Sequence, residues 1–156
     1  MKRNISLAVA LVAAFGLAGC QMFKSDTKES SASSASTYRS SQGEQVALSG
    51  KHEVPANDSS ASGSGTVSVA ADGAVKVHVT VKGMEATAAH IHVAAAGANG
   101  PVAIPLEKQG ADTFVSKADA KMNAEQLAAY RAGRTYLNVH SAKFPNGEIR
   151  AQLKGS

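Results

Sequence analysis

Every second residue is valine in the run VKVHVTVK at residues 75–82, and this alternation limits what the chain can fold into. Successive side chains of a β-strand point to opposite faces, so the run predicts a strand with one apolar and one polar face. A helix would scatter the same four valines around its circumference, because its side chains repeat every 3.6 residues. His78 falls on the polar face, where we expect it to be solvated.

Short apolar or alternating segments, with turn residues between them, predict that the rest of the domain is also built of strands. We expect these strands near residues 46–48, 66–69, 88–93, 102–106, 113–116, 135–140 and 148–153. Asp72 and Gly73 are typical of a two-residue type I′ turn, which places a β-hairpin there. Seven or eight short strands with regular turns favour an all-β fold, an antiparallel Greek-key β-sandwich.

One short helix is expected among the strands. Asn123 is a good N-cap, Gln126 stands three residues later and Gly133 ends the pattern, so the helix should lie near residues 123–132. The chain has no Trp and only seven Tyr and Phe, so aliphatic side chains must fill the core. The predicted core is led by Val75, Val77, Val79, Val81, Ile91, Leu137, Val139, Ile149 and Leu153.

The first 20 residues have the composition of an export signal. Two basic residues precede an apolar run of about a dozen, which is shorter than the roughly 20 residues of a membrane-spanning helix. The segment ends in LAGC at residues 17–20, which resembles the bacterial lipobox in all four positions. The resemblance implies that residues 1–19 are a lipoprotein signal peptide and that Cys20 is lipidated, with palmitate or a similar acyl chain.

Cys20 is the only cysteine, so it has no disulfide partner; lipidation accounts for it better than an ordinary secretory signal with an incidental cysteine. Gln21 rather than Asp follows it, and by resemblance to the sorting pattern of Gram-negative lipoproteins this favours the outer membrane. Residues 20–43 are rich in Ser and nearly free of aliphatic residues, which predicts a disordered tether before a folded domain at residues 44–156. We therefore expect a protein of the bacterial cell envelope and periplasm, attached to the membrane through its N-terminal lipid.

Several segments over residues 45–153 together resemble the CHRD domain, a family named for repeats in chordin. They are Leu48-Ser49-Gly50, Glu53-Val54-Pro55, Ala88–His92, Gly100-Pro101-Val102, Tyr136–His140 and Pro145–Leu153. The resemblance implies a fold and an extracytoplasmic setting, and it does not imply an enzyme.

Three histidines of the domain form a candidate metal site. His90 and His92 are two residues apart in a predicted strand, so both rings leave the same face, and His140 ends another predicted strand. Three imidazoles suit copper or zinc, and their binding should fade below about pH 6.5, where imidazole becomes protonated. His52, near Glu53, is a further candidate ligand.

The His-x-His strand also resembles the copper-binding strand of Cu/Zn superoxide dismutase, and the expected sandwich is of the immunoglobulin or superoxide dismutase kind. The chain has neither a disulfide pair nor zinc-loop histidines, so we do not expect dismutase activity.

The alternative for the same polar residues is a structural or binding network of hydrogen bonds. Buried polar groups must be paired, and imidazole, amide, carboxylate and guanidinium groups can pair with one another. Such a network would join the histidines to Glu53, Asn138, Glu148 and Arg150, with Arg150 paired to one of the two carboxylates.

Charge and motifs narrow the classes of function. Basic residues exceed acidic ones by four, but by only two when Lys2 and Arg3 are set aside, and no cluster of them suggests nucleic-acid binding. The domain has no cysteine, no nucleophile elbow and no phosphate loop, so an enzyme is not expected. Two classes stay open: a lipid-anchored, non-enzymatic binding or interaction module and, as the alternative, a periplasmic domain that binds a copper or zinc ion.

Overall fold

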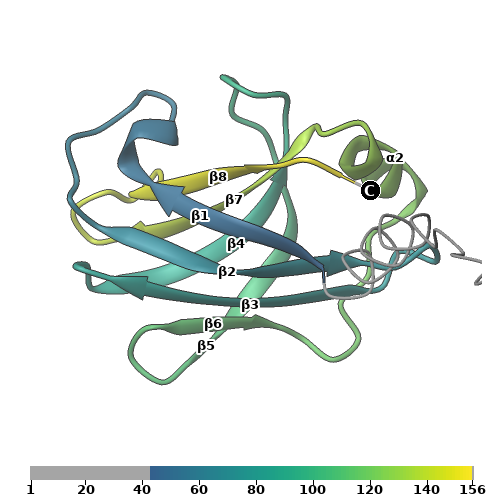
Figure 1. Ribbon diagram of the computed structural model, residues 1–156, viewed down its shortest axis with the longest axis horizontal. Helices are drawn as coiled ribbons and strands as arrows, with labels where there is room; N and C mark the ends of the chain where they lie inside the picture. Colours follow the sequence, from purple (N-terminus) through teal and green to yellow (C-terminus); the bar gives the residue numbers. More distant parts are fainter. Residues whose placement is uncertain (1–42, 156) are drawn as a thin grey trace, which may run out of the picture.

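The strands of the computed structural model, which describes residues 43–155, form one antiparallel sheet that closes into an eight-stranded barrel (Figure 1). Around the barrel the order is β1-β2-β3-β6-β5-β4-β7-β8. The strands are β1 (Glu44–Ser49), β2 (Ser62–Val69), β3 (Val75–Lys82), β4 (Ala86–Val93), β5 (Val102–Gln109), β6 (Thr113–Ser116), β7 (Thr135–Ser141) and β8 (Ile149–Leu153). The predicted signal peptide, Cys20 and nearly all of the tether lie outside the described residues.

The all-β prediction is confirmed, but the prediction of a two-sheet sandwich is wrong. β6 pairs with both β3 and β5, and β8 pairs with β1 through Ser49 and Arg150, so the sheet has no break that would divide it in two. Alternation along a sequence tells which face of each strand is buried, but not which strands become neighbours. Closure also removes the open strand edges that a sandwich would leave.

The barrel is filled by aliphatic side chains, as the scarcity of aromatic residues requires. All nine predicted core residues are buried, and the alternation of β3 appears as buried valines between solvent-facing residues. Phe114 from β6 is fully buried opposite Val79. His78, on the other face of β3, is exposed as predicted.

The helix and the hairpin lie where they are expected. α2 spans Ala124–Arg131 and begins with a capping box between Asn123 and Gln126. The β2–β3 turn is longer than the predicted two-residue turn: Ala70 and Ala74 pair across it, and Gly73 takes a positive φ of 90°. Beside this α-helix, the described residues contain one short 3-10 segment, η1 (Gly50–His52). Neither helix has the length and apolarity needed to cross a bilayer.

β7 is buried on both faces, which is unusual for a barrel strand with a polar outer row. Leu137 and Val139 face the barrel core, whereas Tyr136 and Asn138 face outward and are still only 2% exposed. Two connections cover this outer side, the β1–β2 connection and the β4–β5 loop, and Asn99 of the second bonds to the Val54 carbonyl of the first at 2.7 Å. The fold therefore creates a polar layer between the barrel wall and these connections.

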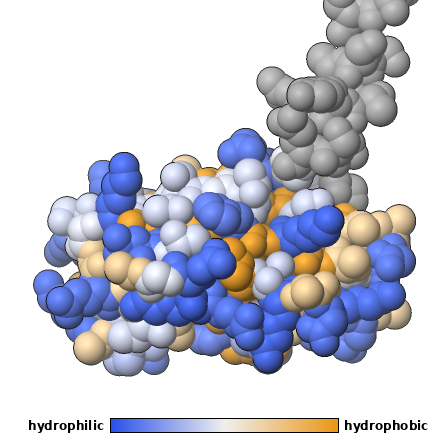
Figure 2. Space-filling model, turned by 90° about the horizontal axis from the view of Figure 1, so that it is seen from below, coloured by the Kyte–Doolittle hydropathy of each residue, from blue (hydrophilic) through white to orange (hydrophobic). Residues whose placement is uncertain are grey.

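Most large hydrophobic side chains of the described residues are at least partly buried. Hydrophilic side chains dominate the face in Figure 2, with apolar residues visible between them. Among the described residues, Val102 is the one large hydrophobic side chain that is exposed, at 48%. Protein-docking surfaces usually show larger contiguous apolar patches.

Candidate functional site

Strand register places the polar residues of β4, β7 and β8 side by side on the outer wall of the barrel, which we call the outer polar face. His90 is paired with Asn138, which in turn is paired with Arg150. One step along, His92 is paired with Tyr136. Residues opposite each other on adjacent strands share a face, so these side chains are neighbours beneath the covering connections.

His140 joins His90 and His92 on this face, and the three form the histidine triad. His140 is paired with Ala88, which puts its ring diagonally across from His90. The His90 Nδ1 and His140 Nε2 atoms are 3.0 Å apart, and one ring nitrogen from each of the three histidines lies within 4.8 Å of the others. The structure thus brings together the three predicted ligands.

Backbone carbonyls fix the orientation of two of the rings. His92 Nδ1 is 2.9 Å from the Gly100 carbonyl, and His140 Nδ1 is 2.9 Å from the Pro145 carbonyl. A carbonyl oxygen only accepts, so each Nδ1 must carry the hydrogen and each neutral ring must keep its lone pair on Nε2. Histidines that bind metals are oriented in this way by their second nitrogen.

All three rings of the triad favour the neutral form. Desolvation by burial, followed by repulsion from His140 and His92, lowers the pKa of His90 from its usual 6.5 to about 4. Burial likewise lowers the pKa of His92 and of His140, although the carbonyl hydrogen bond of each acts in the opposite direction. His90 is therefore neutral well below pH 6.5, and the lowered pKa values of His92 and His140 act in the same direction, so the expected loss of metal binding moves to more acidic conditions.

Next to the triad, three side chains are stacked. The His92 and Tyr136 rings are nearly parallel, 6° apart, with centroids 4.8 Å from each other, and the Arg150 guanidinium lies 3.4 Å from the Tyr136 centroid. Arg150 is 1% exposed and donates to Asn99 Oδ1 at 3.1 Å and to the Ala98 carbonyl at 2.9 Å. The charge of Arg150 interacts with that of Glu53, but no carboxylate of the described residues forms an ion pair with the guanidinium, which instead holds the β4–β5 loop and one face of the tyrosine.

The two carboxylates of the predicted network have different surroundings. Glu148 Oε1 accepts from the Ser59 hydroxyl at 2.6 Å, and Asn57 donates to the Glu148 carbonyl at 3.1 Å, so Glu148 secures the β1–β2 connection. Glu53 is 6% exposed, and its desolvation raises the pKa of its carboxyl, against the nearby positive charge of Arg150. Unlike Glu148 Oε1, the Oε1 atom of Glu53 has no hydrogen-bond partner among the described residues.

Three buried atoms on the outer polar face lack partners in the described part of the chain. They are Glu53 Oε1, His92 Nε2 and Asn138 Oδ1. The network hypothesis therefore accounts for Glu148 and Arg150, but it leaves the centre of the face unsatisfied. Thr135 Oγ1 is also unpartnered, on the opposite face of β7.

A family model for the CHRD domain matches residues 45–153. The chain belongs to the CHRD family. Comparisons with curated proteins and with solved structures found no match. CHRD membership supports, in general terms, a binding or interaction module.

The other histidines of the CHRD domain do not reach the triad. His52 is exposed, and its Nδ1 lies 3.3 Å from the Arg150 carbonyl. Within the described residues, the potential metal-ligand group contains His90, His92 and His140 and no fourth side chain. The expectation that His52 is a further ligand is therefore wrong, because η1 directs it toward the backbone of β8.

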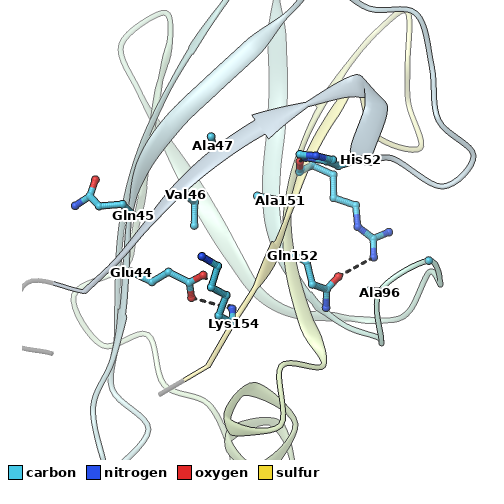
Figure 3. A pocket seen from close by; sticks show the side chains of 11 residues that line it. Glu44, Gln45, Val46, Ala47, His52, Ala96, Ala151, Gln152 and Lys154 are labelled. Carbon is cyan, nitrogen blue, oxygen red and sulfur yellow. Dashed lines mark hydrogen bonds between the residues drawn. The ribbon is translucent and has the colours of Figure 1, made fainter. Parts of the chain in front are cut away.

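A groove of about 440 Å³ lies on the CHRD domain between β1 and β8, which diverge beyond their single pairing (Figure 3). Glu44 closes one end, since its carboxylate accepts from the Lys154 backbone N–H at 2.9 and 3.0 Å. Arg150 and Gln152 line it together with Ala96 of the β4–β5 loop, and Gln152 Oε1 accepts from the guanidinium at 3.3 Å. These polar groups already have hydrogen-bond partners, so they are less available to bind a ligand than the nitrogens of the histidine triad.

Sequence reasoning about the CHRD domain missed the residues that orient the triad. Gly100 and Pro145 contribute only carbonyl oxygens, which any residue could supply, so no pattern marks them. The pairing of Tyr136 with His92 depends on the register of β4 against β7, which no sequence pattern specifies.

Proposed function

We propose that this protein is a lipid-anchored module of the bacterial cell envelope whose CHRD domain binds a copper or zinc ion through the histidine triad. The lipobox resemblance ending at Cys20 supports the anchor, and Gln21 supports the outer membrane. The proposed role is binding and not catalysis, since the domain has no nucleophile motif.

One observation carries the choice of a metal over a purely structural network. The Nε2 lone pair of His92 is buried, has no partner among the described residues, and cannot be exchanged for Nδ1, which donates to Gly100. An unmet buried acceptor costs about 1–3 kcal/mol, and a bound cation removes that cost. A structural network would be expected to satisfy this atom first.

The three rings must move closer together to bind an ion. Two imidazole nitrogens that bind the same tetrahedral metal ion, each at 2.0–2.1 Å, lie about 3.3 Å apart. The His90–His140 nitrogens are already 3.0 Å apart, and the most distant pair of the triad must close from at most 4.8 Å. His90 would bind through Nδ1 by placing its hydrogen on Nε2, which is its other neutral tautomer.

Three neutral nitrogens without a thiolate suit divalent copper or zinc, and intrinsic affinity favours copper. The alternative class, a module for a protein partner, receives less support from the described surface, which shows only Val102 as an exposed large hydrophobic residue.

Thermal unfolding of the untagged full chain, with and without one equivalent of Cu(II) or Zn(II), tests this proposal. The free energy of unfolding of wild type should rise by about 2–3 kcal/mol when the free metal concentration is 100 times the dissociation constant. His92→Ala should abolish the gain, whereas His78→Ala, which removes an exposed histidine of β3, should keep it. If wild type shows no gain, or if His92→Ala gains as much as wild type, the triad is structural.

A further inference from the structure

Buried acceptors meet at the centre of the outer polar face. The side chain of Asn138 acts on the pKa of both His92 and Glu53: it favours the protonated ring and the ionised carboxylate. Because His92 Nε2 carries no hydrogen, this nitrogen and Asn138 Oδ1 are both buried acceptors without a partner among the described residues. Each needs a cation or a hydrogen-bond donor.

The Glu53 carboxylate and the Asn138 amide both pack against Gly147. A Cβ atom on Gly147 would lie 2.5 Å from Glu53 Oε1 and 2.8 Å from Asn138 Nδ2, so both side chains pack directly against its backbone. Asn138 and Glu53 are 2% and 6% exposed, and each has one buried oxygen atom without a partner among the described residues.

The donor set of these atoms specifies what can satisfy them. Asn138 Oδ1 and Glu53 Oε1 can each accept a hydrogen bond, and the three imidazoles can supply lone pairs to a cation. A water molecule on a metal ion binds through its oxygen and keeps two O–H groups, so it matches two free acceptors beside a three-nitrogen metal site.

We propose that a metal ion on the triad keeps a water molecule as an exchangeable fourth ligand, held by hydrogen bonds to Asn138 Oδ1 and Glu53 Oε1. This inference rests on the proposed function and deepens it: the site is of the open kind, with three protein ligands and one replaceable position. Small ligands with a lone pair, such as azide, are the class of molecule that takes this position. His90 and His140 are only half-buried, which leaves a side of the triad next to solvent.

Water-proton relaxation of the Cu(II)-loaded full chain tests the fourth position directly. A bound water that exchanges with bulk solvent speeds the relaxation, and azide should reverse this effect by displacing the water. Asn138→Ala and Glu53→Gln should each weaken Cu(II) binding about 10-fold or more, since partners of metal-site groups have effects of that size. Glu53→Gln should also bind azide more tightly than wild type, because the carboxylate that repels the anion is gone.

Glu148→Gln is the matched control, since it changes an equally buried Glu whose Oε1 is already bonded to Ser59. It should leave both Cu(II) affinity and azide binding unchanged. Circular dichroism of each variant shows whether it is folded, and if Asn138→Ala is not, wild type and Glu53→Gln decide the matter.

The outcomes separate the two proposals. Cu(II) binding by wild type with no effect of azide on relaxation overturns the water ligand and leaves the metal site standing. Unchanged Cu(II) affinity in folded Glu53→Gln and Asn138→Ala also overturns it. Failure of wild type to bind Cu(II) overturns the proposed function, and this inference with it.

Discussion

At the scale of single residues, lone pairs rather than charges define the outer polar face. Burial favours the neutral form of each ring of the triad, and two carbonyl oxygens determine which nitrogen of His92 and of His140 stays free. Arg150, a cation on the same face, donates hydrogen bonds to the β4–β5 loop and lies against the Tyr136 ring. The chemistry available there is therefore that of a neutral nitrogen ligand set.

The lowered pKa of His90 predicts how the metal-free protein responds to acid. The folded state binds the His90 proton near pH 4 and the unfolded state near pH 6.5, so the unfolded state takes up more protons between these values. The free energy of unfolding should consequently fall as the pH drops from 6.5 toward 4. We expect His90 to contribute about 1–2 kcal/mol of this loss, because a half-buried ring is only partly desolvated and water screens part of its repulsion by His140 and His92.

Urea unfolding of wild type and His90→Gln in the presence of a chelator, at pH 7 and pH 5, measures this contribution. Glu53, whose pKa is raised by burial, works against the trend, so the difference between the two proteins is the relevant quantity. Equal pH dependence of wild type and His90→Gln would show that the His90 proton is not linked to folding.

At the scale of elements, β7 contributes both to the barrel core and to the outer polar face. The inner residues of β7 pack in the barrel, and its outer residues supply Tyr136, Asn138 and His140 to the polar layer. β3 shows the simpler arrangement, with a buried apolar face and a solvated polar one. The difference arises because the β4–β5 loop and the β1–β2 connection cover β7 and leave β3 open.

Val79→Asp and His78→Asp introduce the same side chain at neighbouring positions of β3 and so test this two-faced character. Val79 is fully buried, and an isolated buried charge costs several kcal/mol against a total stability of about 5–15 kcal/mol. Val79→Asp should therefore unfold the domain, whereas His78→Asp should cost less than about 1 kcal/mol. Chemical denaturation followed by circular dichroism distinguishes the two, and similar stability of both variants would contradict the assigned faces.

Elements with a strong local signal could be predicted, and their neighbours could not. The valine alternation gives β3 and its buried side, and the Asn123–Gln126 capping box gives the start of α2. The side-by-side placement of Ser49 and Arg150 depends on strand order, which no local pattern encodes. For the same reason His90 and His92 could be assigned to one face, whereas their contact with His140 required the register of β4 against β7.

At the scale of the whole molecule, the chain pairs a barrel of buried aliphatic residues with an N-terminal segment of very different composition. The described residues account for the CHRD domain, and the expected lipidation site precedes them. The hypothesis of a membrane anchor therefore rests on the sequence of residues 17–21.

Fractionation of bacteria that express the full chain tests the anchor and its address. Wild type should sediment with outer membranes and give an acylated N-terminal peptide by mass spectrometry, whereas Cys20→Ala should appear in neither form. Gln21→Asp is the matched control: it should remain acylated but shift to the inner membrane. Membrane association of Cys20→Ala would rule out lipid as the sole attachment.

The junction of β1 with β8 has a consequence for the order of events during folding. It joins the first and last strands of the domain, and the His52–Arg150 contact beside it spans 98 residues of chain. Contacts so distant in sequence form late, because the loop between them must be ordered first. Since Arg150 also holds the loop that orients His92, a chain truncated before β8 would present its histidines unassembled. Metal capture would thus be restricted to molecules that have completed folding.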